Sequence, residues 1–177
     1  MIEEAVAFAR KAHAGAVRKG TNIPYITHPL ETAVIVSLMT EDEELIVAAL
    51  LHDVIEDTEV TPEQLRELFG GRVTDLVLAE TEDKRGSWFE RKNATVEHLK
   101  CATLENKILT LADKLSNLRC TAKDYLLLGE EVWQRFNEKD KQKHKWYYGS
   151  IMRELEELRE YSCYQEYVLL FHKVFGT

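Results

Sequence analysis

Apolar residues recur at helical spacing along almost the whole chain, and no alternating run of strand length stands out. From Ile2, apolar positions three or four residues apart mark one face of a first helix, which we expect to end near Gly15 or Gly20. Pro29 is well placed to open a second helix that runs through Met39. The pattern therefore predicts helices from the first residues onward.

Helix-start signals and periodicity predict further helices in the rest of the chain. Acidic residues at 41–44 begin a third helix, which contains the run HDVIED. Thr61 is followed by Pro62 and, three positions on, by Gln64, a capping-box pattern that opens a helix ending at Gly70 and Gly71. The remaining helical patterns cover residues 73–81, 87–101, 104–124, 130–136, 140–161 and 164–175. Because no repeat, low-complexity tract or linker interrupts them, we predict an all-α fold in a single domain over residues 1–177.

Composition adds that this is a soluble globular chain of ordinary make-up, with 177 residues, 45% hydrophobic and 31% charged. No run approaches the roughly eighteen apolar residues of a membrane span, and the amphipathic start MIEEAVAFARKAH does not resemble a signal peptide. The net charge of −8 argues against a general nucleic-acid binder. An anionic ligand must instead be met by a local cluster of positive charge or by a metal ion.

The three cysteines point to a reducing compartment. Cys101, Cys120 and Cys163 are odd in number and widely spaced, with no CxxC pair. We therefore expect reduced thiols in a cytoplasmic protein.

The strongest candidate for chemistry is His52-Asp53, which stands in the run AALLHDVIEDT at residues 48–58 together with Glu56 and Asp57. Desolvating four such side chains on a core-facing helix is costly unless each is paired or bound to a metal. This favours a metal-dependent site built on a helix. The alternative is a solvated polar face of an amphipathic helix, which fits poorly because the apolar block 47–51 directly precedes His52.

Three other segments could supply partners. His28 precedes Pro29 at a helix start, where it could bind an ion or simply cap or pack. Asp113 interrupts the apolar helix LTLADKLSNLR and shares a face with Asn117, four residues on; it could bind a metal or be held in a salt bridge. The basic pair Arg18-Lys19 lies beside the loop that carries His28.

Together, His28, His52, Asp53 and Asp113 provide two imidazoles and two carboxylates. This donor set leaves coordination positions open for water and substrate, and manganese, iron and zinc all accept it. Adjacent residues are about 100° apart around a helix, so His52 and Asp53 reach one ion only if it lies over the turn between them.

Glu56 and Asp57 follow Asp53 by three and four residues and are surplus to this set. They are well placed to orient or deprotonate a water molecule whose pKa the ion lowers. The alternative is a solvent-facing helix end, since Thr58 and Thr61 follow.

In this order, these residues resemble the HD-domain superfamily of metal-dependent phosphohydrolases, and more narrowly the hydrolase domain of RelA/SpoT-type alarmone enzymes, including the small alarmone hydrolases. The matching segments are AHAGAVRKGTNIPYITHPLETA, AALLHDVIEDTEVTPEQLRELFGGRVTDLV and LADKLSNLR. The resemblance runs from about Ala5 to Arg119, with a weaker echo at KWYYGSI. The dipeptide HD alone is a weak signal, but its combination with RKG…PYITHP and DKLSNLR is specific. It implies a single helical HD domain of about 8–10 helices.

The resemblance also implies roles. His28, His52, Asp53 and Asp113 match the metal ligands of the family, whose usual ion is Mn²⁺, and we expect one ion per site. Glu56 and Asp57 match the pair that positions the nucleophilic water. The family reaction removes the 3′-pyrophosphate of (p)ppGpp, the alarmone of the stringent response, giving GDP or GTP and pyrophosphate.

The nucleotide contacts follow from the same resemblance. Arg18 and Lys19 match a basic pair around the guanine base and phosphates, and Asn117 matches an asparagine at the nucleotide sugar. An aromatic residue, Trp146 or Tyr147, is expected near the nucleotide. The partner is therefore a small-molecule nucleotide, with no nucleic acid or membrane.

Some features depart from the family or leave choices open. The loop between Lys19 and Pro24, GTNI, is expected to differ in length from that of many relatives and so to alter base recognition, and residues 82–91 have no equivalent that can be matched. The charged stretch 137–145 is either a solvated loop and helix start or a source of lysines for an anionic substrate. A hydrolase acting alone is expected, because the chain is too short to add a synthetase domain. Alternative functions are another nucleotide phosphohydrolase, for example one acting on the 2′-phosphate of NADPH, and a non-catalytic alarmone-binding module. The sequence does not reveal the oligomeric state.

Overall fold

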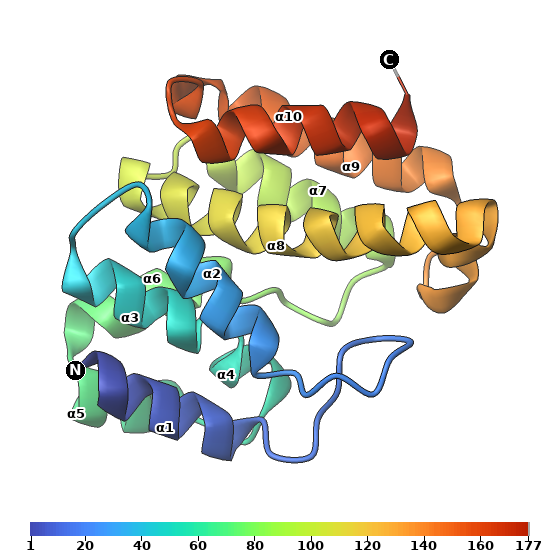
Figure 1. The fold of residues 1–177 in the computed structure, drawn as a ribbon. Helices are drawn as coiled ribbons and strands as arrows, with labels where there is room; N and C mark the ends of the chain where they lie inside the picture. The colour runs from blue at the N-terminus through green and yellow to red at the C-terminus, as the bar shows by residue number, and fades with distance from the viewer. Residues whose placement is uncertain (177) are drawn as a thin grey trace.

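The structure is a computed structural model that describes residues 1–176, and over that range it contains ten α-helices and two 3₁₀ helices (Figure 1). In chain order these are α1 (Ile2–Ala12), α2 (Thr27–Ser37), α3 (Glu43–Leu51), α4 (Val54–Asp57), α5 (Pro62–Phe69), α6 (Gly71–Glu80), α7 (Trp88–Leu99), α8 (Leu104–Leu128), η1 (Gly129–Arg135), α9 (Lys141–Glu154), η2 (Glu156–Leu158) and α10 (Ser162–Phe175). Within residues 1–176, β structure is limited to one isolated bridge between Val17 and Pro24. The predicted all-α fold is confirmed.

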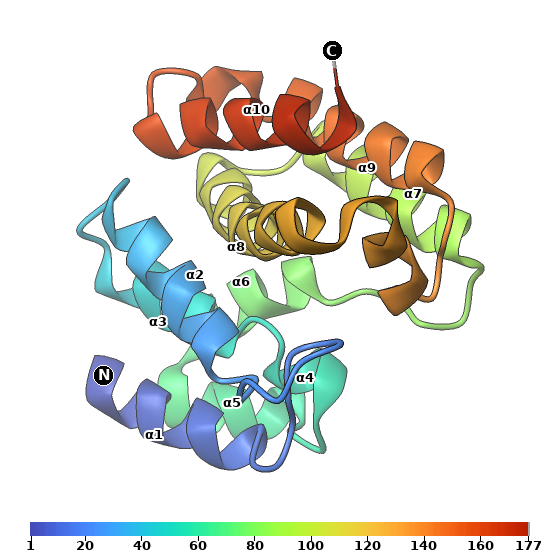
Figure 2. The same cartoon turned by 45° about the vertical axis from the view of Figure 1, so that its right-hand side comes forward.

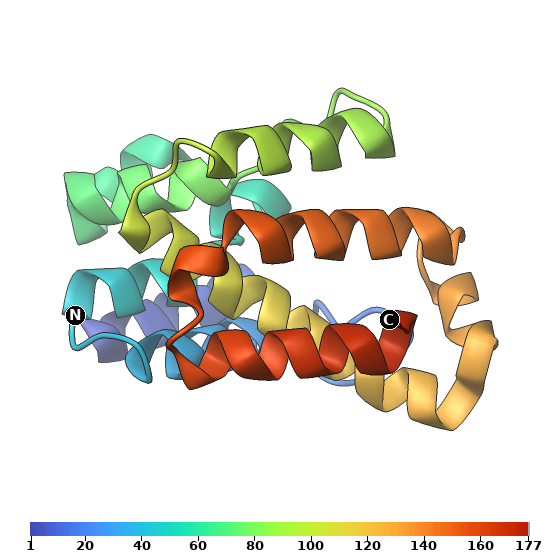
Figure 3. The ribbon, with the colours of Figure 1, turned by 90° about the horizontal axis from the view of Figure 1, so that it is seen from above.

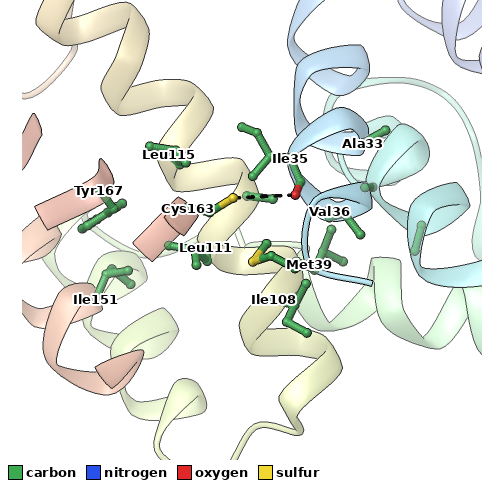
Figure 4. Close-up of a cluster of buried hydrophobic side chains, with 14 of the residues drawn as sticks. Ala33, Ile35, Val36, Met39, Ile108, Leu111, Leu115, Ile151, Cys163 and Tyr167 are labelled. Carbon is green, nitrogen blue, oxygen red and sulfur yellow. Dashed lines mark hydrogen bonds between the residues drawn. The ribbon is translucent and has the colours of Figure 1, made fainter. Parts of the chain in front are cut away.

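Helix α8 forms the centre of the molecule and packs against α2, α3, α6 and α10. Helices α2 and α3 lie on one side of it, and α10 and α9 lie on the other (Figures 2 and 3). Figure 4 shows the apolar core between these layers, with Leu111 and Leu115 of α8 beside Ile35 of α2 and Tyr167 of α10. The Sγ atom of Cys163 lies 4.0 Å from the carbonyl oxygen of Ile35, so α10 and α2 meet across α8.

The helix-start signal read from the sequence at Thr61 is present in the structure, whereas the second helix begins at Thr27, two residues before the predicted Pro29. Thr61 Oγ1 accepts a hydrogen bond from the backbone N–H of Gln64, and the Gln64 side chain accepts from the N–H of Thr61. Gly70, at φ +87°, ends this helix in a conformation that favours glycine. Ser87 forms a second capping box, with Glu90.

Three other predicted helix boundaries were wrong. The predicted third helix is broken at His52-Asp53, where Asp53 adopts φ −97° and ψ −5°. Helix α8 continues to Leu128, where Gly129 at φ +57° ends it, and the segment predicted as the next helix is 3₁₀. The predicted helix over 140–161 ends at Glu154, because Leu155 leaves the helical region at φ −99° and ψ +10°.

Over the described residues, none of the helices has the length and apolar character needed to cross a membrane. All three cysteines are unpaired thiols; Cys163 is buried and Cys101 is exposed.

Asp42 stabilises the start of α3 in two ways. Its carboxylate accepts hydrogen bonds from the backbone N–H groups of Glu44 and Leu45, at 3.0 and 3.2 Å. It also pairs with Arg72 of α6, which binds Glu105 at the start of α8. One carboxylate therefore caps α3 and helps to join three helices.

Replacing Asp42 with alanine is expected to lower the free energy of unfolding by about 1–2 kcal/mol, because it removes the cap. Asp42→Asn keeps a capping oxygen and loses only the charge, which is worth at most about 1 kcal/mol at this partly exposed position. Hydrogen bonds from Arg72 lower the pKa of Asp42. The charge contribution is therefore present above the ordinary carboxyl pKa and is lost as pH falls through the lower pKa of the folded state. Denaturant unfolding of both variants between pH 2 and pH 7 checks this; a pH-independent difference between Asp42→Asn and the parent would contradict it.

Candidate metal centre and its cavity

The four predicted ligand side chains come from three parts of the fold. His28 lies in the first turn of α2, and Asp113 lies near the middle of α8. His52 ends α3 and Asp53 begins α4. The break between these helices replaces the continuous helix expected from the sequence, and it frees the two neighbouring side chains from the fixed angle that a regular helix imposes.

The structure brings the four side chains together. His28 Nε2 lies 3.1 Å from Asp113 Oδ1 and 3.2 Å from His52 Nε2. Asp53 Oδ2 lies 3.0 Å from His52 Nε2 and 3.5 Å from His28 Nε2. Ligand atoms of His28, His52 and Asp113 all lie within 4.8 Å of one another, and these three residues form a possible metal site.

Hydrogen bonds on the far side of each imidazole ring orient it. His52 Nδ1 lies 2.8 Å from the carbonyl oxygen of Ala49, which can only accept, so Nδ1 carries a proton and Nε2 is the ring nitrogen that faces the other ligand candidates. His28 Nδ1 lies 2.8 Å from Ser116 Oγ. Metal-binding histidines typically use the second ring nitrogen in this way.

The spacing and chemistry of the donors fit a single cation. Two ligand atoms that each lie roughly 2.1 Å from one ion are about 3.0 Å apart at a right angle and about 3.4 Å apart at a tetrahedral angle. Three observed separations, 3.0, 3.1 and 3.5 Å, are close to these values, and the fourth, between His52 Nε2 and Asp113 Oδ1, is slightly wider at 3.7 Å. His28 and His52 are each 2% exposed, so the donors are removed from water. The residues present therefore fit a divalent cation bound by nitrogen and oxygen.

The charges of the centre are strongly coupled. Burial by itself raises the pKa of Asp53. The His52 imidazole lowers this pKa by more, so the pKa of Asp53 lies below the usual carboxyl range. Burial lowers the pKa of His52, but Asp53 and Asp113 raise it well above its ordinary value. Both carboxylates are thus held in the charged form that binds cations.

Neighbouring side chains hold the carboxylates in place. Tyr25 donates a 2.5 Å hydrogen bond to Asp53 Oδ2. Lys114 lies 2.5 Å from Asp113 Oδ2, and Asn117 Nδ2 donates to Asp113 Oδ1 at 2.7 Å. The predicted sugar-binding Asn117 therefore bonds to a carboxylate of the centre.

A cavity of about 390 Å³ opens above the centre. Its lining includes every predicted site residue: Arg18, Lys19, His28, His52, Asp53, Glu56, Asp57, Asp113 and Asn117. It also includes cationic and aromatic residues that were not predicted as site residues, among them Trp88, Arg91, Lys92, Lys114 and Tyr148.

Glu56 and Asp57 differ in their surroundings. Glu56 is partly buried, and its Oε2 accepts a 3.1 Å hydrogen bond from the backbone N–H of Glu82. Burial raises the pKa of Glu56. Asp57 is more exposed, and Lys84 lies 2.7 Å from its Oδ1. Glu56 is the better placed of the two to act as a base.

The predicted basic pair lies on a tight loop beside α4 (Figure 2). Arg18 donates to Asn117 Oδ1 at 3.4 Å, and Lys19 donates to Asn137 Oδ1 at 3.3 Å. Gly20, at φ +70°, lets the loop approach Arg135 so closely that a Cβ atom would lie 2.8 Å from Arg135 Cδ. The loop thus reaches across to the segment after α8.

The residues of the charged segment 137–145 that line the cavity are not its lysines. Asn137, Glu138 and His144 line the cavity. Lys141 pairs with Glu130, and Lys143 pairs with Glu138, as in a charged surface segment. Of the two aromatic candidates that follow, Tyr147 lines the cavity, whereas Trp146 stacks on Phe89. Within the described chain, the buried Tyr147 hydroxyl has no hydrogen-bond partner.

Lys92, which was not predicted, directly follows the segment 82–91, for which no equivalent was recognised. It pairs with Glu82, and its Nζ lies 5.1 Å from the centre of the Tyr147 ring. Because Lys92 is one of the cationic side chains that line the cavity, Lys92→Met is expected to raise the KM for an anionic nucleotide about tenfold, with a smaller change in kcat.

Lys100→Met is the matched control, because Lys100 lies just after the same helix, is half-exposed and pairs with Glu97. Steady-state kinetics of both variants test the expectation. Equal KM values for the two variants would show that Lys92 does not meet the substrate.

Comparisons with known proteins agree with this geometry. The model of the HD domain family matches residues 5–139. The guanosine-3′,5′-bis(diphosphate) 3′-pyrophosphohydrolase MESH1 of Danio rerio is 43% identical over 122 residues, which cover 67% of this chain and 68% of that protein. A guanosine-3′,5′-bis(diphosphate) 3′-pyrophosphohydrolase of Aquifex aeolicus is 38% identical over 121 residues, but this chain covers only 17% of its length. The solved structure of a metazoan orthologue of SpoT that hydrolyses ppGpp has a TM-score of 0.80 at 28% identity, covering 99% of this chain and 96% of that one.

Proposed function

The chain belongs to the HD domain family, and we propose that it is a metal-dependent hydrolase that removes the 3′-pyrophosphate of (p)ppGpp, giving GDP or GTP and pyrophosphate. The observation that carries the proposal is the convergence of two imidazoles and two carboxylates beneath a cavity lined by cationic side chains. The relatives named as 3′-pyrophosphohydrolases support the choice of substrate.

We propose one Mn²⁺ per site, with His28, His52, Asp53 and Asp113 as its ligands. The donor set supports an ion of this class, and the hydrogen bonds that orient both imidazoles support their role as ligands. When bound, the cation supplies Lewis acidity, which lowers the pKa of water and withdraws charge from a phosphoryl oxygen.

Two carboxylate side chains act on the attacking water molecule and its proton. Glu56, with Asp57 beside it, orients a water molecule and accepts its proton as the water oxygen bonds to the phosphorus next to the ribose O3′. The bond between that phosphorus and O3′ breaks, pyrophosphate leaves, and O3′ takes up a proton. The hydrogen bond from Glu82 to Glu56 Oε2 keeps the carboxylate in one orientation.

Cationic side chains meet the substrate phosphates. Arg18 and Lys19 on one wall and Lys92 on another supply positive charge that the whole protein, at −8, lacks. We propose that Asn117 contacts the sugar near Arg18, and that Tyr147 lies beside the nucleotide. Unpaired cysteines are consistent with action in the cytoplasm, which is part of the proposal.

Product analysis tests the proposal. The protein is incubated with Mn²⁺ and, separately, with ppGpp, pppGpp, NADPH and GTP, and products are identified by ³¹P NMR. We expect GDP and pyrophosphate from ppGpp, and no turnover in the presence of EDTA. Release of phosphate from NADPH alone would replace the proposal with the phosphatase alternative. Calorimetric binding of ppGpp without product would indicate a non-catalytic module.

A further inference from the structure

The His28 imidazole is oriented by a hydroxyl group rather than by a carbonyl. Its Nδ1 lies 2.8 Å from Ser116 Oγ, and the same oxygen lies 2.8 Å from Glu31 Oε2. Ser116 is completely buried, and His28 is 2% exposed, so water does not compete for these bonds. Ser116 and Glu31 have no role in the proposed chemistry described above.

The direction of these hydrogen bonds follows from proton counting. A serine hydroxyl has one proton to donate and lone pairs to accept with, whereas a carboxylate only accepts. Ser116 therefore donates to Glu31 and accepts the N–H of His28 Nδ1. A proton therefore stays on Nδ1, and Nε2, which faces His52 and Asp113, is the ring nitrogen available to a cation.

The same centre contains a contrasting case. His52 Nδ1 faces the carbonyl of Ala49, which fixes the proton on Nδ1 whatever the rest of the protein does. The hydroxyl beside His28 would serve equally well as a donor if nothing accepted its proton. The carboxylate of Glu31 is thus what selects the tautomer of His28.

Glu31 is itself held in place as an anion. Its Oε1 accepts from Arg119 Nη1 at 3.1 Å, and Arg119 binds both carboxylate oxygens of Glu166 on α10, at 2.7 and 2.6 Å. Glu31 and Arg119 are 37% and 32% exposed, so the hydrogen-bonded chain runs from the centre to the surface. It joins α2, α8 and α10.

We propose that Glu31, acting through Ser116, is a positioning residue that keeps the proton of His28 on Nδ1 and so presents Nε2 to a cation. This inference rests on the proposed metal-dependent function. Without the carboxylate, the Ser116 hydroxyl turns to donate to Nδ1, and the proton of His28 moves to Nε2, where it occupies the position that a cation needs. Loss of such outer partners typically weakens metal binding about 10- to 100-fold.

The test variant is Glu31→Gln, which keeps the size of the side chain. Its single carbonyl oxygen is attracted to the Arg119 guanidinium, so its NH₂ group faces Ser116 and donates to it. The matched control is Glu166→Gln, which makes the same change on the other side of Arg119 without touching Ser116. Thermal unfolding confirms that both variants fold.

Two readouts are needed, and neither is activity. In metal-free protein, ¹⁵N–¹H correlation spectra of the imidazole show which ring nitrogens of His28 carry a proton, and electron paramagnetic resonance of free Mn²⁺ gives the affinity. We expect Nδ1–H in the parent and in Glu166→Gln. In Glu31→Gln we expect a proton on Nε2 and none on Nδ1, with Mn²⁺ binding about 10- to 100-fold weaker.

An unchanged tautomer in Glu31→Gln, or equal losses of Mn²⁺ affinity in the two variants, would overturn the inference. A second variant, Ser116→Ala, is expected to weaken Mn²⁺ binding as well, whereas Ser150→Ala, which removes a buried hydroxyl on α9, is not. Because the tautomer is read without substrate, a protein that fails to hydrolyse ppGpp can still confirm this inference. Conversely, if the protein hydrolyses ppGpp and the tautomer of His28 is unchanged in Glu31→Gln, the role of Glu31 is rejected and the proposed function stands.

Discussion

Replacing Asp53 with alanine is expected to abolish ppGpp hydrolysis. The carboxylate lies 3.0 Å from one imidazole of the centre and 3.5 Å from the other, and its removal takes one of four donors from the proposed ion. The loss should exceed the roughly 10- to 100-fold that follows the removal of an outer partner. Initial rates of GDP formation at saturating Mn²⁺ measure it.

Asp75→Ala is the control for Asp53→Ala, because Asp75 lies on the surface of α6 and pairs only with Arg66. Its rate should equal that of the parent. If Asp53→Ala retains more than a few per cent of the parent rate at every Mn²⁺ concentration, Asp53 is not a ligand, and the centre consists of the other three side chains.

Glu56→Gln is expected to lower kcat by about 10²- to 10⁴-fold, because it removes the base proposed to accept the proton of water. The amide keeps an oxygen for the backbone N–H of Glu82, so the local structure should persist. Affinity for Mn²⁺ and for ppGpp should stay within a few-fold of the parent. Rapid-quench kinetics with calorimetry separate these effects; a matching loss of Mn²⁺ affinity would instead make Glu56 a ligand.

The sequence predicted helices where local signals are sufficient. The capping boxes at Thr61 and Ser87 mark their helix starts because both partners lie within one turn. The break at His52-Asp53 could not be predicted, because it accompanies contacts with residues far away in the sequence. Asp53 contacts His28 of α2, and His52 contacts Asp113 of α8. The 3₁₀ form of η1 likewise has no separate sequence signal. The assignment of the whole chain to a single domain stays a prediction.

The four ligand candidates were predictable because each interrupts or adjoins an apolar helical run. Their convergence is observed, and the resemblance to the HD domain family is confirmed by the match over residues 5–139. Lys114 was not predicted, because a lysine in a helical sequence usually lies on the surface. In the structure Lys114 is largely buried and pairs with Asp113 of the centre. Glu31 and Ser116 carried a usable signal, since each follows a ligand residue by three positions and so shares its helix face.

The cavity explains how an acidic protein can bind a polyanion. Arg18, Lys19 and Lys92 come from distant parts of the chain, so their proximity is a property of the fold and not of any basic run. Two of the carboxylates that also line the cavity, Glu56 and Glu82, are hydrogen bonded or paired. Local arrangement of charge, rather than net charge, therefore determines which ligands the site can accept.

Anomalous diffraction at the manganese edge, from crystals grown with Mn²⁺, tests the central claim most directly. A single strong peak is predicted within bonding distance of Nε2 of His28 and His52 and of one carboxylate oxygen each from Asp53 and Asp113. A peak elsewhere, or none among these side chains at saturating Mn²⁺, would contradict it.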